Sequence, residues 1–78
     1  MAKVIDTRKM TGSFSFEDCP QTEVKVGDWV GFKSDIEQSG QITKIEGNRL
    51  HLRNKNGFSG EYLRHAKTTI EDARDCWI

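Results

Sequence analysis

The sequence predicts a small all-β domain, a barrel or compact sheet of about five short strands. Runs of β-forming residues alternate with turn signals at Gly47-Asn48 and Asn56-Gly57. No connection between these runs is long enough to hold a crossover helix, which excludes parallel βαβ units. The 78 residues supply one domain, and their 35% hydrophobic content suffices for one small core.

Gly47-Asn48 predicts a tight hairpin between residues 41–46 and 49–54, because primed two-residue turns need the positive φ that Gly and Asn tolerate. The predicted cross-strand pairs are Glu46 with Arg49, Ile45 with Leu50, Lys44 with His51 and Thr43 with Leu52. The core face then holds Thr43, Ile45, Leu50 and Leu52, and the solvent face holds Lys44, Glu46, Arg49, His51 and Arg53. Ile42 falls on the polar face under strict alternation, so we expect a bulge near Thr43 that returns it to the interior.

The segments on either side of this hairpin supply further strands. If side chains alternate in direction on both sides of a turn at Gly27-Asp28, four residues face the core, namely Val24, Val26, Val30 and Phe32. Trp29 lies on the opposite side of the same strand. The polar stretch from Ser34 to Gly40 predicts a loop, and Phe58 to Leu63 are predicted to form a return strand after Asn56-Gly57.

At the N-terminus we expect an arm over residues 1–12, followed by a single barrel domain over 13–78. Met1 to Met10 forms either a strand through Val4-Ile5 or a loose arm, and partial disorder is favoured. Phe14 and Phe16 alternate with serines, which predicts an edge strand over Gly12 to Glu17 that ends before Pro20.

At the C-terminus two interpretations compete. Thr68 to Glu71 fits a capping box followed by one or two helical turns up to Cys76. Alternatively, a closing strand spans Lys67 to Ile70 and a turn follows. In either case Trp77-Ile78 is expected to dock on the domain, because an exposed Trp leaves a large apolar surface in water.

Catalytic and metal-binding chemistry have little support in the sequence, so we expect no enzyme, no cofactor and no metal. Ser59 lacks the spacing of a nucleophile elbow, and no phosphate-binding Gly loop occurs. Cys19 and Cys76 are expected to be structural thiols, with a disulfide or metal site as minor alternatives. The chain has no run as long and apolar as a membrane span, and MAKVIDTRKM lacks a signal-peptide hydrophobic segment, which favours a cytoplasmic protein without membrane contact.

The formal net charge of zero conceals a segregation of charge along the chain. Residues 44–67 carry six Lys or Arg against two Glu, whereas residues 17–37 carry six acids against two Lys. A basic hairpin face could contact phosphates, although a hairpin must expose polar residues in any case. The candidate nucleic-acid-binding residues are Lys44, Arg49, His51, Arg53, Lys55 and Arg64.

The aromatic residues give a second functional signal. Phe32 and Phe58 are expected in the core, whereas Trp29 and Tyr62 are candidates for surface recognition. Together with the acidic residues Asp35 and Glu37, they would form a surface for an unknown protein partner.

The block Val26-Gly27-Asp28-Trp29-Val30, followed by residues 40–45 and 47–52, resembles the small SH3-like barrels of the KOW and Tudor type. The resemblance covers roughly forty residues and implies a barrel, but such barrels bind RNA, DNA, proteins or methylated peptides. Residues 34–39 are acidic where nucleic-acid-binding members usually carry Lys, Arg and Gly. A Tudor-like cage would need Trp29, Phe32, Phe58 and Tyr62 to converge. The chain, with its Asp75-Cys76-Trp77 ending, is also similar to small uncharacterised bacteriophage proteins.

Three functions therefore follow from the sequence. The first is a protein-interaction or regulatory adaptor, and the second is a nucleic-acid-binding barrel that uses the basic hairpin face. The third is a structural or oligomeric subunit that associates through an exposed N-terminal edge strand.

Overall fold

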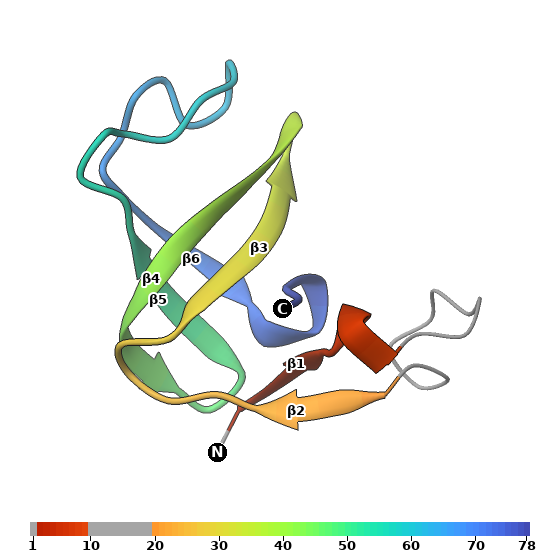
Figure 1. The fold of residues 1–78 in the computed structure, drawn as a ribbon. Helices are drawn as coiled ribbons and strands as arrows, with labels where there is room; N and C mark the ends of the chain where they lie inside the picture. Colours follow the sequence, from red (N-terminus) through yellow and green to blue (C-terminus); the bar gives the residue numbers. More distant parts are fainter. Residues whose placement is uncertain (1, 10–19) are drawn as a thin grey trace.

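The computed structural model describes residues 2–9 and 20–78, which form an all-β structure (Figure 1). In chain order its elements are β1 (Lys3–Ile5), the 3-10 turn η1 (Thr7–Lys9), β2 (Gln21–Glu23), β3 (Trp29–Ser34), β4 (Ile36–Glu46), β5 (Arg49–Arg53), β6 (Thr68–Asp72) and the 3-10 turn η2 (Ala73–Asp75). The predicted all-β class is confirmed, and these ranges contain no α-helix. Within them, neither 3-10 turn has the length and apolarity that crossing a bilayer requires.

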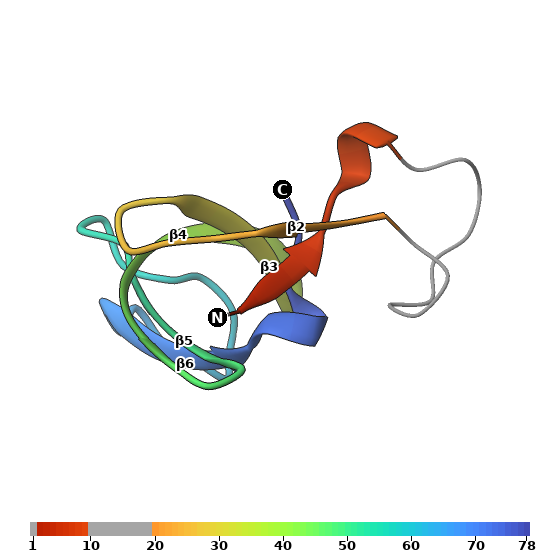
Figure 2. The ribbon, with the colours of Figure 1, turned by 90° about the horizontal axis from the view of Figure 1, so that it is seen from below.

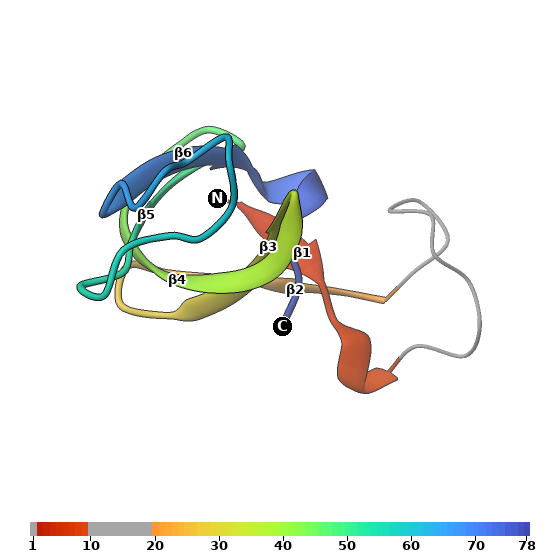
Figure 3. The same cartoon turned by 90° about the horizontal axis from the view of Figure 1, so that it is seen from above.

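The strands make two antiparallel sheets, β1-β2 and β3-β4-β5-β6. β3 and β6 are the edges of the larger sheet, which curves around the core without closing on itself (Figure 3). The segment after η2 passes between the sheets, as the view from below shows (Figure 2). There Trp77 bridges to Ile5 of β1 and to Gly31 of β3.

The contact between Gly31 and Trp77 fixes this C-terminal segment. The two residues exchange backbone hydrogen bonds of 2.7 and 2.9 Å. A Cβ added at Gly31 would lie 2.3 Å from Nε1 of Trp77, so only glycine lets the indole approach β3 this closely. The prediction that Trp77 and Ile78 dock on the domain is confirmed.

The β4–β5 hairpin has the predicted turn and three of the predicted pairs, Glu46 with Arg49, Ile45 with Leu50 and Lys44 with His51. The expected bulge lies between Ile42 and Lys44, and it places Ile42 opposite Leu52 with 1% of its surface exposed. Thr43 was predicted to face the core opposite Leu52, and this is wrong. The bulge takes up Thr43, which is exposed and donates its hydroxyl to the His51 carbonyl at 3.3 Å.

The loop predicted from Ser34 to Gly40 is wrong, because β4 already begins at Ile36 and Ser34 pairs with Ile36 around a one-residue turn. Asp35 occupies that turn with φ of 64°, a conformation that Asp tolerates better than most side chains. The polar residues that suggested a loop include Glu37 and Ser39, which are exposed on the strand.

The turn at Asn56-Gly57 is present, with the Gly57 amide donating to the Asn54 carbonyl at 2.9 Å. The return strand predicted from Phe58 to Leu63 is wrong, and β6 pairs with β5 instead. Gly60 has φ of 98° and Arg64 has φ of 46°, so the chain between them turns back on itself rather than extending.

Val26 was predicted in the core but is 58% exposed. It lies at the corner of a turn in which the Asp28 amide donates to the Lys25 carbonyl at 3.1 Å and Asp28 Oδ2 accepts from the Lys25 amide at 3.0 Å. The turn interrupts the alternation of inward and outward side chains between Val24 and Val30. Both of these residues are buried.

Of the two interpretations of Met1 to Met10, the strand is the one observed in residues 2–9. Partial disorder is wrong for this part, since Ala2, Val4 and Asp6 are buried and β1 pairs with β2. The predicted edge strand over residues 12–17 and Cys19 lie outside the described residues.

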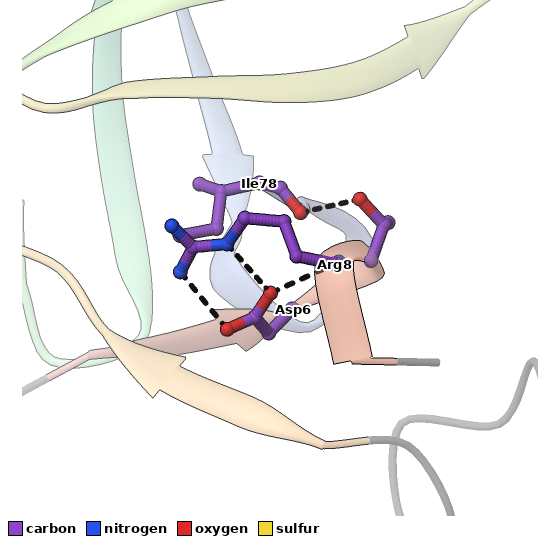
Figure 4. Close-up of polar contacts among 4 residues, drawn as sticks. Asp6, Arg8 and Ile78 are labelled. Atoms are coloured by element: carbon purple, nitrogen blue, oxygen red, sulfur yellow. Dashed lines mark hydrogen bonds and ion pairs between the residues drawn. The ribbon is translucent and has the colours of Figure 1, made fainter. Parts of the chain in front are cut away.

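A buried carboxylate anchors the chain after β1 (Figure 4). Asp6 is 1% exposed, and Nε and Nη2 of Arg8 each donate to one of its oxygens at 2.9 Å. The hydroxyl of Thr7 donates to the Ile78 carbonyl at 2.6 Å. The Thr7 hydrogen bond connects η1 to the C-terminal segment.

At the C-terminus the closing strand is observed and the capping box at Thr68 is wrong. β6 continues to Asp72, whose side chain accepts from the Arg74 amide and caps η2. A single 3-10 turn is therefore the only helical element after β6. Pairing with β5 overrides the capping signal because it satisfies the backbone groups of alternate residues along β6.

Side chains from both sheets and from the 54–67 loop form one core. Phe32 and Phe58 are fully buried, as predicted, and pack edge to face with ring centroids 5.3 Å apart. In residues 2–9 and 20–78 the other buried hydrophobic residues are Ala2, Val4, Val24, Val30, Ile42, Leu50, Leu52, Ala73 and Cys76.

Candidate functional site

A row of residues crosses the outer face of the four-stranded sheet. Trp29 of β3 lies opposite Gln41 of β4, Gln41 opposite Arg53 of β5, and Arg53 opposite Thr68 of β6. Residues directly opposite each other project from the same face of a sheet. Because Val30 points into the core, its neighbour Trp29 points outward, where 53% of it is exposed.

Trp29 lies in a surface cleft of about 570 Å³ at one end of this row. The lining residues are Trp29, Gln41, Arg53, Asn54, Lys55 and Asn56. Clefts of this size hold small ligands or single chemical groups of larger ones.

Two amide side chains of the cleft are held in place by backbone groups. Nε2 of Gln41 donates to the Gly27 carbonyl at 3.1 Å, and Nδ2 of Asn54 donates to the Ser39 carbonyl at 3.2 Å. Oδ1 of Asn54 also accepts from the Asn56 amide at 3.0 Å. The polar part of the cleft is therefore preorganised by β4 and by the turn after β5.

The charge of the cleft is positive. Arg53 and Lys55 are exposed, and neither forms an ion pair within the described residues. Among the residues that the structure describes, no carboxylate lines the cleft. An exposed indole beside two unpaired cations suits an aromatic ligand that carries negative charge.

In the rest of the predicted basic face, carboxylates lie beside the cations. Glu46 lies between two of its members, 3.5 Å from Nζ of Lys44 and 2.6 Å from Nε2 of His51. The hydrogen bond from His51 and the charge of Lys44 lower the pKa of the Glu46 carboxyl. Arg49 lies opposite Glu46 on one side and opposite Asp72 on the other. Carboxylates therefore divide the basic hairpin face.

Arg64 lies in the 54–67 loop and is not part of the cleft. Its Nε donates to the Glu61 carbonyl at 3.2 Å. Of the six candidate nucleic-acid-binding residues, the structure thus brings only Arg53 and Lys55 to Trp29.

The candidate protein-binding residues separate into two places. The Tyr62 amide donates to Asp35 Oδ2 at 3.0 Å, so these two residues meet at the β3–β4 turn, where Tyr62 is 81% exposed. Glu37 follows on β4, opposite Lys33. Trp29 lies five residues away from Ser34 along β3, roughly 17 Å at the rise of an extended strand. Trp29 and Tyr62 therefore do not form one surface.

The aromatic residues do not form a cage of the Tudor type. Phe32 and Phe58 are fully buried in the core, and Tyr62 lies at the far end of β3 from Trp29. Trp29 is the sole aromatic residue among those that line the cleft.

Other reactive groups give no second site in the part of the chain that the structure describes. That part contains no group of three or more His, Cys, Asp or Glu side chains that could hold a metal ion. Cys76 is a free, buried thiol, and its pKa is raised to about 12 by burial and by the nearby carboxylates of Glu71, Asp75 and Asp72.

The amides Gln41, Asn54 and Asn56 were missed as site residues in the sequence. The signal for Gln41 is its place opposite both Trp29 and Arg53. The Trp29 pair becomes visible only once residues 36–40 are assigned to a strand, and the Arg53 pair follows from the bulge at Thr43. No family model, curated protein or solved structure matches the chain.

Proposed function

We propose that this protein is a cytoplasmic, non-enzymatic binding module that takes single-stranded nucleic acid into the Trp29 cleft. The observation that carries the proposal is an exposed indole beside two unpaired cations, Arg53 and Lys55, with no carboxylate among the lining residues. Proteins that bind single strands combine these two features, aromatic side chains that stack on bases and cations that contact the backbone.

In the proposed mode one base stacks on the indole of Trp29. The flanking phosphates contact Arg53 and Lys55, and Asn56 at the rim is available to a base edge. A duplex offers few free base faces, because its bases already stack on one another, so the stacking contact selects single strands.

We also propose that the fold is an SH3-like barrel of the KOW and Tudor type. Three features support this assignment. β3, β4, β5 and β6 follow one another as an antiparallel meander, a 3-10 turn follows β6, and the chain then returns to β1 and β3. Methylated-peptide binding is disfavoured, because Arg53 and Lys55 would repel a cationic side chain at Trp29.

A protein-interaction adaptor is the second candidate function, and one observation favours it. Tyr62 is the most exposed of the large hydrophobic side chains in the described residues, and Ile36, next to Asp35, is 49% exposed. The Asp35–Tyr62 hydrogen bond holds this surface at the tip of the β3–β4 hairpin. On this proposal Tyr62 and Glu37 would contact the partner protein.

Fluorescence anisotropy with labelled single- and double-stranded DNA and RNA at low salt tests the first proposal. Trp29→Ala should weaken single-strand binding by about 5- to 150-fold, since stacking contributes about 1–3 kcal/mol per base. Tyr62→Ala is the matched control, an exposed aromatic residue remote from the cleft, and should bind as the wild type does. Circular dichroism checks that both variants are folded.

Absence of binding to every oligonucleotide, or equal binding by the two variants, would reject the nucleic-acid proposal. A pull-down from a cell extract tests the second candidate. A specific protein that is lost with Tyr62→Ala and kept with Trp29→Ala would support the adaptor, and identical profiles for both variants would exclude the surface at Tyr62.

A further inference from the structure

β6 is an edge strand that offers hydrogen-bonding groups on one side. It pairs with β5 and with no other strand in residues 2–9 and 20–78. The Asn54 amide donates to the Lys67 carbonyl at 2.9 Å, and the Ala73 amide donates to the Asn48 carbonyl at 2.6 Å. Residues 67 and 73 therefore direct these groups toward β5. Since direction alternates along an antiparallel strand, Thr68 and Ile70 direct their N–H and C=O groups outward.

The sequence of β6 has few of the usual protections of an edge, and its charged residues, Glu71 and Asp72, lie at one end of the strand. The strand has no proline, no lysine and no bulge, and its five pairs with β5 are in continuous register. Ile70 lies at its centre with 55% of its surface exposed, and Thr68 and Asp72 on either side are exposed as well. A β-branched apolar residue at this position favours pairing with another strand.

The charges along β6 favour a second copy of this chain as the partner. Lys67 precedes the strand, and Glu71 and Asp72 end it. In an antiparallel pair centred on Ile70, Thr68 lies opposite Asp72 of the second copy, and Lys67 lies diagonal to Glu71 of the second copy on the same face. A parallel pair would place like charges side by side.

We propose that β6 pairs antiparallel with β6 of a second copy about a two-fold axis at Ile70. Such an interface is self-complementary, so it closes as a dimer and does not extend further. The two four-stranded sheets then continue as one. From the sequence we expected an oligomer that associates through an exposed N-terminal edge strand. The present proposal uses β6, a different edge strand.

Sedimentation equilibrium over a range of about 10 μM to 1 mM tests the dimer, because we expect so small an interface to have a dissociation constant within this range. The wild type should change from monomer to dimer. Ile70→Lys places two like charges at the axis and should raise the dissociation constant at least about tenfold. Ile36→Lys is the control, the same substitution at a 49% exposed strand position far from β6, and should dimerise like the wild type.

A cross-link tests the register and needs no charged substitution. Ile70→Cys in a Cys19→Ser background should form an intermolecular disulfide, since directly opposed residues bring their Cα atoms within about 5.5 Å. Ile36→Cys in the same background should not. If circular dichroism shows that Ile70→Lys is unfolded, the two cysteine variants decide whether the dimer forms through β6.

A wild type that remains monomeric throughout, or equal cross-linking by the two cysteine variants, overturns the proposal. Equal dimerisation of folded Ile70→Lys and Ile36→Lys overturns it as well, because the dimer would then use another surface. None of these measurements involves nucleic acid, so their failure is distinct from a failure of the proposed function.

Discussion

The salt dependence of binding measures how many cations contact the nucleic acid. In the structure two unpaired cations, Arg53 and Lys55, lie beside Trp29. Each phosphate contact on a single strand contributes about −0.7 to the slope of log K against log salt, so two contacts predict about −1.4. A basic face in which Lys44, Arg49 and Arg64 also took part would give about −3.5.

The difference between these slopes is large in a titration. Between about 50 and 200 mM salt, affinity should fall about 7-fold with two contacts and more than about 100-fold with five. The assay is anisotropy with a labelled oligonucleotide of about five nucleotides, near the lower site size of small barrels. Arg53→Gln should reduce the slope to about −0.7. Lys44→Gln should leave the slope unchanged, because Glu46 lies 3.5 Å from that ammonium group.

Two results would refute this reasoning. A slope steeper than about −3 that Lys44→Gln reduces would mean that the whole hairpin face binds, including the part divided by Glu46. A slope near zero would mean that the cleft binds without phosphate contacts. Trp29→Ala separates the two contributions, because it should lower the affinity and leave the slope as it is.

Two predictions concern the packing of the C-terminal segment. Gly31→Ala should destabilise the fold by about 2–4 kcal/mol in urea unfolding, since the new Cβ displaces the Trp77 indole and strains two backbone hydrogen bonds. Ser39→Ala, opposite Gly31 on β4, is the control, and a Gly31 effect below about 0.5 kcal/mol would contradict the packing argument. In a Cys19→Ser background, Cys76 should resist alkylation at pH 8 and react fully in urea, because a pKa of about 12 leaves about one thiol in ten thousand ionised. Rapid labelling of the folded protein would show that the thiol is accessible.

The sequence predicted the β4–β5 hairpin well because its determinants are local. A two-residue turn at Gly47-Asn48 sets the pairing of every residue near it, and the mismatch of Ile42 with the core face indicated the bulge. By contrast, Ser34 to Gly40 was assigned to a loop because its polar residues resemble loop composition. Its turn depends on the positive φ of Asp35, which composition does not reveal.

The candidate site was predicted only in part because its members come from three strands and a loop. Trp29 and Arg53 were each identified, but for different functions and in different groups. Their association depends on Gln41, which pairs with both and lies just beyond the segment that was assigned to a loop. Long-range pairing of this kind cannot be obtained from alternation within one strand.

The two proposals have a geometric connection, because the row that contains the cleft ends at the proposed dimer interface. Arg53 lies opposite Thr68 of β6, and a two-fold axis perpendicular to the joined sheet keeps both clefts on the same outer face. At ordinary strand spacing and rise, the two Arg53 residues would lie about 20 Å apart. A short oligonucleotide occupies one cleft, whereas a longer strand could occupy both and would bind more tightly through effective concentration. The number of phosphate contacts would double, so a slope near −2.8 on long strands and near −1.4 on short ones is the combined consequence of the dimer and the cleft. A monomer would show the same slope on both.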